Sequence, residues 1–296
     1  MNLIEINGLR KRYKDVEALR GFDLKVPEGT VCGFLGRNGA GKTTTLKILL
    51  GLVRPNGGSA QIFGLDCTDP AQSVLIRQRI GFVTENKDLY PYMTVGQTLR
   101  FTAGFFPKWR HDLAARYLKL FALPEDRKVT KLSKGNLSKL MLLLSMARGA
   151  ELLILDEPTD GLDPAVTEEM LAALVDLAAQ EGVAIFFSSH QLQEVEQIAD
   201  RVCIIHEGRA VLQEELDELR SSYRLIQMVV EQGIEDSALA FTGVEKINRE
   251  GRVISVLVSQ NAEQVIETAR ARQATSIDVR PVGLKEIFLT AVRTQA

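Results

Sequence analysis

Residues 36–43 read Gly-Arg-Asn-Gly-Ala-Gly-Lys-Thr, and they follow the apolar run Val31-Cys32-Gly33-Phe34-Leu35. This is the pattern G-x-x-x-x-G-K-[ST] between a predicted strand and a predicted helix, which runs from about residue 43 to residue 51. Glycines let such a loop turn its backbone N–H groups around an anion, and the N-terminus of the helix favours the same negative charge. Lys42 adds a positive charge near the β- and γ-phosphates, and the Thr43 hydroxyl is expected to bind Mg²⁺. The residues predicted to bind a nucleoside triphosphate in this loop are Gly36, Arg37, Asn38, Gly39, Ala40, Gly41, Lys42, Thr43 and Thr44.

The composition is that of an ordinary globular chain. Of its 296 residues, 45% are hydrophobic and 25% are charged, which suggests one or two domains. The net charge of −2 provides no basic field for nucleic acid, so no nucleic-acid partner is expected. The three cysteines are scattered, and Cys32 and Cys203 lie in apolar runs. We predict buried thiols rather than a disulfide framework or a zinc site, as in a reducing cytosol.

No membrane segment is expected from the sequence. The start, residues 1–5, lacks the basic and apolar regions of a signal peptide. The longest apolar stretch, residues 140–147, is far too short to span a bilayer. We therefore expect a cytoplasmic protein that works at a membrane only by binding another subunit.

The hydrophobic pattern predicts an α/β fold. Continuous apolar runs at 152–155 and 183–187 are typical of strands buried on both faces of a parallel sheet, and residues 165–180 between them have helical spacing. Residues 1–84 read as short strands and turns around the first helix, and residues 201–212 as a hairpin. We predict a P-loop domain over residues 1–215 with an inserted helical subdomain at about 85–150, whose candidate helices are 98–105 and 112–121.

The rest of the chain predicts a second, smaller domain. A charged segment at 214–222 is interpreted as a break. Beyond it, strand-like and helix-like segments alternate, which is enough for an α+β domain over residues 222–296. The predicted strands are 225–230, 253–258 and 276–279, and the predicted helices are 262–272 and 284–294.

Three polar residues follow the two buried strands. Asp156 and Glu157 come directly after the first, where ligands bind in parallel sheets, and His190 follows the second. Asp156 is a candidate Mg²⁺ ligand with Thr43, and Glu157 a candidate general base for an attacking water. His190 is placed to donate a hydrogen bond to a γ-phosphate. The alternatives are an acidic turn that caps the next helix and a histidine that caps the helix after it.

This set of motifs resembles the ATP-binding cassette (ABC) ATPases, over roughly residues 3–214. Its most specific part is Leu132-Ser133-Lys134-Gly135-Asn136, which is similar to the family signature Leu-Ser-Gly-Gly-Gln. The resemblance implies ATP as substrate with Mg²⁺, and a head-to-tail dimer in which Ser133 and Gly135 reach the γ-phosphate bound by the other subunit. Ser133 has a second interpretation as a plain helix cap.

The resemblance also implies roles for residues that the other patterns do not assign. Tyr13 would stack on adenine, or it is simply a surface aromatic in a basic turn. Glu85 falls where the family has a mobile glutamine that helps to bind Mg²⁺. Residues 161–163 look like the loop that contacts the other subunit, although Asp163 before Pro164 is also a good helix cap.

Three positions depart from the family pattern. Lys134 replaces the first signature glycine, Asn136 replaces the glutamine, and Glu85 stands where glutamine is usual. We expect Lys134 to weaken or tune closure of the dimer. Glu85 still offers an oxygen to Mg²⁺, so Glu85→Gln is expected to keep substantial ATPase activity.

The resemblance implies transport, and most closely export. The closing residues 284–289 look like the terminal helix of antibiotic, lipid or multidrug exporter ATPases. A separate membrane permease, at whose cytoplasmic face the chain would lie, is expected to contact the helical region near residues 89–93; a local core is the other interpretation of that apolar segment. The alternative functions are a soluble ABC ATPase that remodels a nucleic-acid or protein assembly, and a regulatory subunit that does not hydrolyse ATP. The transported molecule is not encoded in this chain.

Overall fold

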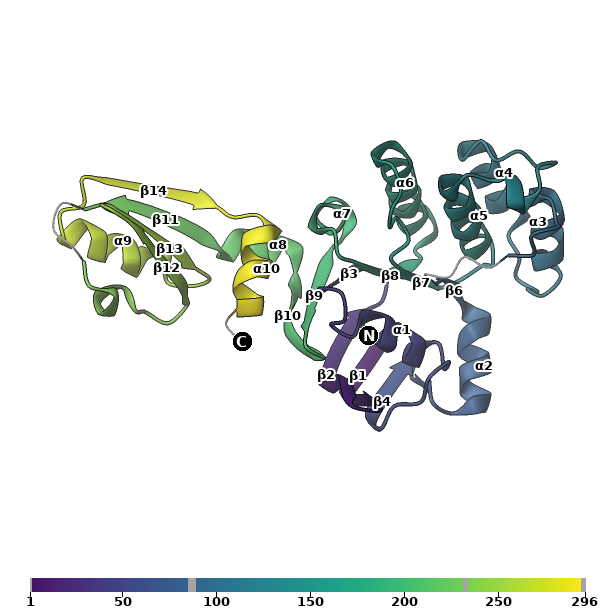
Figure 1. Ribbon diagram of the computed structural model, residues 1–296, viewed down its shortest axis with the longest axis horizontal. Helices are drawn as coiled ribbons and strands as arrows, with labels where there is room; N and C mark the ends of the chain where they lie inside the picture. The colour runs from purple at the N-terminus through teal and green to yellow at the C-terminus, as the bar shows by residue number, and fades with distance from the viewer. Residues whose placement is uncertain (1, 85–88, 231–233, 294–296) are drawn as a thin grey trace. The chain divides into compact units, whose positions relative to one another are not determined.

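The computed structural model of the chain describes residues 2–84, 89–230 and 234–293 (Figure 1). The chain divides into two compact units, residues 1–213 and residues 214–296. The first unit contains two sheets and the second contains one, and each unit has its own hydrophobic core, so each is described by itself.

The centre of the first unit is a six-stranded sheet with the order β10-β9-β3-β8-β7-β6. Its strands β9, β3, β8, β7 and β6 pair in parallel, and β3, β7 and β8 are buried along their whole length. Full burial explains why these strands read as continuous apolar runs instead of alternating. The strands of this sheet are β3 (Val31–Leu35), β6 (Ile80–Val83), β7 (Leu152–Asp156), β8 (Ala184–Ser189), β9 (Arg201–His206) and β10 (Arg209–Glu215).

A second sheet, antiparallel and with the order β2-β1-β4-β5, lies on one side of the parallel sheet (Figure 1). Helix α1 (Lys42–Leu49) contacts strands of both sheets, and three aromatic rings join them. The ring centroids of Phe22 and Phe34 are 5.6 Å apart, and those of Phe34 and Phe186 are 5.2 Å apart. Its strands are β1 (Asn2–Tyr13), β2 (Val16–Pro27), β4 (Gly57–Ile62) and β5 (Leu65–Asp66).

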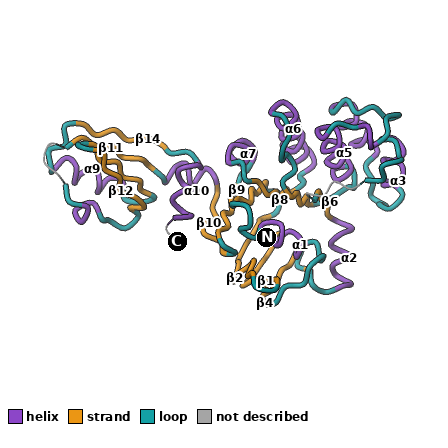
Figure 2. The backbone as a smooth tube through the Cα atoms, in the orientation of Figure 1, coloured by secondary structure: helices purple, strands orange, loops and turns teal. Residues whose placement is uncertain are grey.

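Helices cover the other face of the parallel sheet, and a helical group is inserted between β6 and β7 (Figure 2). The two helices predicted within residues 85–150 are present, and Thr94 opens the first of them with a capping box completed by Gln97. No helix within the described residues is both long enough and apolar enough to cross a membrane. These helices are α3 (Val95–Ala103), α4 (His111–Leu120), α5 (Lys134–Met146), α6 (Pro164–Glu181) and α7 (Leu192–Ile198), with the short 3-10 helix η1 (Val129–Lys131).

The expectation of only strands and turns around the first helix, up to residue 84, was wrong at α2 (Pro70–Arg79). This helix begins with a strong signal: the Asp69 carboxylate accepts a hydrogen bond from the Gln72 N–H, and Pro70 occupies the first turn. Its apolar face is narrow, because Ser73 and Ile76 are its only described buried residues. The sequence did not predict this helix because its amphipathic pattern is weak.

The second unit is an antiparallel sheet, β12-β13-β11-β14, with helix α9 packed on one face. The segment 214–222 is not a simple break, because most of it forms helix α8, in which Leu216 and Leu219 are buried. Strand β12 also escaped prediction, since four of its seven residues are charged, as suits an edge strand. The elements are α8 (Leu216–Ser222), β11 (Arg224–Val229), η2 (Asp236–Leu239), β12 (Val244–Glu250), β13 (Val253–Val258), α9 (Ala262–Ala271), β14 (Ser276–Pro281) and α10 (Leu284–Arg293).

Candidate active site

The carboxyl ends of three neighbouring strands bring the predicted motifs together. Strand β8 lies between β3 and β7, and in the register Leu35 is opposite Ser189 while Asp156 is opposite Ser188. The phosphate-binding loop leaves β3, the acidic pair ends β7, and His190 follows β8. Their side chains therefore meet at one edge of the sheet, which is where parallel sheets bind ligands.

The phosphate-binding loop is held tightly against its neighbours. A Cβ atom on Gly36 would lie 2.7 Å from the backbone oxygen of Ile205, so only glycine fits at this close approach. Gly41 precedes α1 in a left-handed conformation with φ of 115°. The Lys42 side chain is buried, and its Nζ atom donates a hydrogen bond of 2.7 Å to the Gly36 carbonyl. This bond fixes the ammonium inside the curve of the loop.

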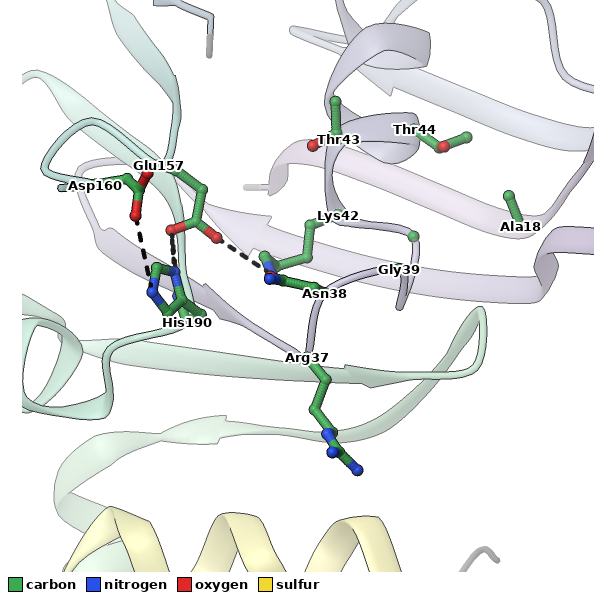
Figure 3. Close-up of a pocket in the computed structure, with 11 residues that line it drawn as sticks. Ala18, Arg37, Asn38, Gly39, Lys42, Thr43, Thr44, Glu157, Asp160 and His190 are labelled. Atoms are coloured by element: carbon green, nitrogen blue, oxygen red, sulfur yellow. Dashed lines mark hydrogen bonds and ion pairs between the residues drawn. The ribbon is translucent and has the colours of Figure 1, made fainter.

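Glu157 connects the lysine to the histidine. Its Oε1 atom lies 3.2 Å from Lys42 Nζ, and its Oε2 atom lies 2.8 Å from His190 Nδ1 (Figure 3). The backbone N–H of His190 also donates to Oε2, at 3.3 Å. On the other side of the imidazole, Nε2 lies 3.9 Å from Asp160 Oδ1. A carboxylate held in place between an ammonium and an imidazole can accept a proton from water.

A cavity of about 500 Å³ opens beside these groups. Most of the predicted phosphate-binding loop lines it together with Glu157 and His190, while Ala18 and Asp160 were not predicted. Ala18 belongs to no sequence motif, and only the tertiary packing of β2 brings it to the cavity. Asp160 could have been predicted, because it is a third carboxylate shortly after Asp156 and Glu157. The lining residues are Ala18, Arg37, Asn38, Gly39, Gly41, Lys42, Thr43, Thr44, Glu157, Asp160 and His190.

The oxygen donors needed for Mg²⁺ lie next to the cavity. Thr43 also lines a smaller pocket of about 180 Å³, and Asp156 lines the same pocket. The Asp156 side chain is buried, and its Oδ1 atom accepts a hydrogen bond of 2.7 Å from the Ser188 hydroxyl. A hydroxyl and one carboxylate fit Mg²⁺, which completes its shell with water and phosphate oxygens. Glu85, the third predicted ligand, lies outside the described residues.

Five predicted nucleotide ligands do not line this cavity: Gly36 and Ala40 of the loop itself, and Tyr13, Ser133 and Gly135. Tyr13 ends β1 and is 42% exposed, and the Nζ atom of Lys11 lies 4.9 Å from the centre of its ring. Ser133 caps α5, since its hydroxyl accepts a hydrogen bond of 3.2 Å from the Asn136 N–H. Gly135 is in the first turn of the same helix. Ser133 thus has the capping role that was its alternative interpretation, and a further role in ATP binding stays a prediction.

Comparison with known proteins settles the family. Residues 19–160 match the sequence profile of the family described as ABC transporter. The daunorubicin resistance ATP-binding protein DrrA3 of Streptomyces coeruleorubidus is 33% identical, over 97% of this chain and 94% of its own length. The chain belongs to the ABC transporter family. It is similar to the ATP-binding subunits of the exporter-like branch, among them the bacitracin transport ATP-binding protein BcrA of Bacillus licheniformis, which is 36% identical over 75% of this chain and 72% of its own length.

Solved structures of ABC cassettes confirm the predicted fold. The ATP-binding subunit of an ABC transporter matches 74% of this chain and 92% of its own, with 29% identity and a TM-score of 0.66. A dimeric bacterial ABC transporter cassette matches 72% of this chain and 98% of its own, with 23% identity and a TM-score of 0.65. The matched share is close to the size of the first unit, so the fold of this ABC protein is that of a cassette with a further unit attached.

Proposed function

We propose that this ABC protein is the ATP-hydrolysing subunit of an exporter, and that two copies of it close around ATP to drive a separate membrane permease. The observation that carries the proposal is the Glu157 carboxylate, held between Lys42 Nζ and His190 Nδ1 at the edge of a cavity lined by the phosphate-binding loop. Three chemically different groups converge there on the place where a γ-phosphate would lie.

Hydrolysis of ATP at such a site depends on positioning and on charge. The backbone N–H groups of the loop and the Lys42 ammonium would bind the phosphates and stabilise the negative charge that develops in the transition state. Glu157 would accept the proton of the attacking water, and His190 would orient the γ-phosphate through a hydrogen bond. Mg²⁺, held by Thr43 and Asp156, would supply positive charge at the β- and γ-phosphate oxygens.

The cavity lacks two of the predicted ATP-binding residues of its own chain, which supports a role for a second copy. Ser133 and Gly135 stand at the N-terminus of α5, where a helix favours an anion, yet neither lines the cavity of its own chain. In a head-to-tail dimer the α5 N-terminus of each copy would close the cavity of the other. ATP would then bind more tightly to the closed dimer than to the open one, and this difference drives the conformational change.

An exposed aromatic cluster supports the contact with a permease. Tyr90, Tyr92, Phe101 and Phe105 are each at least 41% exposed, although their rings touch one another. The ring centroids are 5.8 Å apart for Tyr90 and Tyr92, 5.4 Å for Tyr90 and Phe101, and 5.0 Å for Phe101 and Phe105. A contiguous exposed aromatic patch is typical of a protein-binding surface. We assign this aromatic cluster to the permease, which would hold the chain at the cytoplasmic face of the membrane.

The names of the relatives support export as the direction of transport. They include proteins named for bacitracin transport, daunorubicin resistance and Nod factor export. We therefore propose export.

The test uses Glu157→Gln, which keeps the size of the side chain but removes the base. The purified variant should bind ATP, lose nearly all hydrolysis and accumulate as an ATP-bound dimer in size-exclusion chromatography. Normal turnover in this variant would contradict the assignment of the base. Absence of ATPase activity in the unaltered protein, both alone and with its permease, would contradict the proposed function itself.

A further inference from the structure

Ser188 is a fully buried serine at the edge of the site. It is the last residue but one of β8, and in the sheet it is paired with Asp156 of β7 on one side and with Phe34 of β3 on the other. Its hydroxyl donates a hydrogen bond of 2.7 Å to Asp156 Oδ1 and accepts one of 3.0 Å from the backbone N–H of Glu157. One hydroxyl therefore binds both residues of the acidic pair.

The backbone of Glu157 needs such support. Its φ angle is 47°, in the left-handed region that residues other than Gly, Asn and Asp seldom adopt. A residue remains in this region only where its surroundings hold it there. The Ser188 hydroxyl binds the N–H of this same residue, next to the bond whose rotation φ describes.

The direction of the Glu157 carboxylate depends on that backbone angle. With φ at 47° the side chain lies between Lys42 and His190. A return to the extended or helical region would turn the Cβ atom and move the carboxylate away from both groups. The same hydroxyl fixes the rotation of the Asp156 carboxylate, because a charged acceptor binds a hydroxyl strongly and at a defined angle.

We propose that Ser188 is a positioning residue for ATP hydrolysis: its hydroxyl locks the Asp156–Glu157 peptide so that the metal ligand and the base are set together. This inference rests on the proposed function, which gives Asp156 and Glu157 their roles. Ser188 itself lines neither the cavity beside Glu157 nor the smaller pocket beside Asp156. Its hydroxyl acts by donating a hydrogen bond to the Asp156 carboxylate and accepting one from the backbone N–H of Glu157.

The neighbouring serine does not share this arrangement. The Ser189 hydroxyl donates to Glu194 Oε2, at 2.7 Å, and accepts from the Gln191 N–H, at 2.9 Å. These bonds hold the start of the next helix and do not involve the acidic pair. The position of Ser188, one residue earlier on a strand, directs its side chain to the opposite face of β8.

The experiment compares Ser188→Ala, Ser188→Thr and Ser145→Ala. Alanine removes the hydroxyl, and threonine restores it on a residue that suits a strand. Ser145 is the matched control: it is also buried, and its hydroxyl donates to the carbonyl of Phe82 at 2.8 Å, outside the cavity. For each variant we would measure kcat and KM for ATP, the Mg²⁺ concentration that gives half-maximal activity, and the melting temperature. The affinity for a fluorescent ATP analogue would be measured with Mg²⁺ and with EDTA.

Ser188→Ala should lower kcat by about tenfold or more, as expected for a lost hydrogen bond to a charged group in the transition state, while KM changes little. It should raise the Mg²⁺ concentration that gives half-maximal activity. Binding of the ATP analogue should weaken at limiting Mg²⁺, which KM at saturating Mg²⁺ does not report, and should be unchanged in EDTA. Ser188→Thr should recover activity above the level of the alanine variant, and Ser145→Ala should keep the kcat of the unaltered protein.

Three results would overturn the inference. They are a kcat for Ser188→Ala within about twofold of the unaltered protein, an equal loss in Ser145→Ala, and no gain from Ser188→Thr over Ser188→Ala. Each leaves the proposed function intact, because the unaltered protein would still hydrolyse ATP and Glu157→Gln would still abolish it. An unaltered protein without ATPase activity would instead contradict the proposed function. The comparison of analogue binding with Mg²⁺ and with EDTA would then test only whether Ser188 positions the metal ligand Asp156.

Discussion

His190 Nδ1 lies 2.8 Å from Glu157 Oε2, although 33 residues separate the two in the sequence. The same carboxylate contacts Lys42 through its other oxygen, so one side chain receives a hydrogen bond from the histidine and an ion pair from the lysine. The orientation of the base therefore depends on the histidine as well as on its own backbone.

His190→Ala tests this dependence. Without the imidazole, the Glu157 carboxylate keeps its contacts with Lys42 and with the backbone N–H of residue 190, but the contact with Nδ1 and the predicted γ-phosphate hydrogen bond are lost. We expect kcat to fall by about 100-fold, with a much smaller change in the affinity for ATP, since proton transfer and charge stabilisation act mainly in the transition state. Steady-state phosphate release and binding of a fluorescent ATP analogue measure the two effects separately. A fall in affinity as large as the fall in kcat would contradict the assignment.

Gly36→Ala tests the close approach in the phosphate-binding loop. The added Cβ would lie 2.7 Å from the Ile205 carbonyl oxygen and 2.8 Å from Ile205 Cγ2, so the loop must shift. We expect a loss of stability of about 1–3 kcal/mol, as for overpacked sites, and weaker ATP binding. Thermal unfolding with and without ATP measures both. Gly57→Ala is the control, because its Cβ meets only the Arg10 side chain at 3.8 Å, and it should bind ATP normally.

The sequence predicted those parts of the site whose chemistry lies in contiguous motifs. The structure places the loop around Lys42, the base candidate Glu157 and His190 beside one cavity, because each follows a strand of the same parallel sheet. Ala18 and Ser188 were not predicted, since their contacts depend on the packing of strands and not on any local pattern. Strand β12 was not predicted either, because its charged sequence lacks a clear apolar face.

The thiols give a test of burial that does not depend on the active site. Burial raises the pKa of Cys32 and of Cys67 from 9.0 to about 12, and it also raises the pKa of Cys203. A raised pKa means that the folded chain keeps its thiol protons between about pH 9 and pH 12 while the unfolded chain loses them, so this term destabilises the fold as the pH rises through that window.

Alkylation of the thiols should show the same effect. At pH 9 we expect negligible alkylation of the native protein by iodoacetamide and rapid alkylation of three thiols after unfolding in urea, counted by mass spectrometry. Rapid modification of the native chain at this pH would show that the sheet opens readily or that these thiols are accessible.

The aromatic cluster gives a test of the permease contact. Tyr92→Ser combined with Phe105→Ser removes its two most exposed rings, which are 64% and 65% exposed. We expect copurification with the permease to fall by at least tenfold, as is usual for the loss of aromatic residues at the centre of an interface. Leu52→Ser, at a position 59% exposed and outside the cluster, is the control and should copurify normally. If the double variant and the control copurify equally well with the permease, the aromatic cluster is not part of the interface.

The most direct test of the central claim mixes two inactive variants. Lys42→Ala disables the phosphate-binding loop, and Ser133→Arg blocks the N-terminus of α5. If ATP is hydrolysed between two copies, a dimer of one variant with the other has one intact site, formed by Lys42 of the second and Ser133 of the first. A 1:1 mixture should then recover up to about a quarter of the unaltered ATPase rate, because half of the dimers are mixed and each has one of two sites. Full ATPase activity of Ser133→Arg alone would contradict the account. So would a mixture that recovers no ATPase activity although both variants are folded and form dimers with ATP.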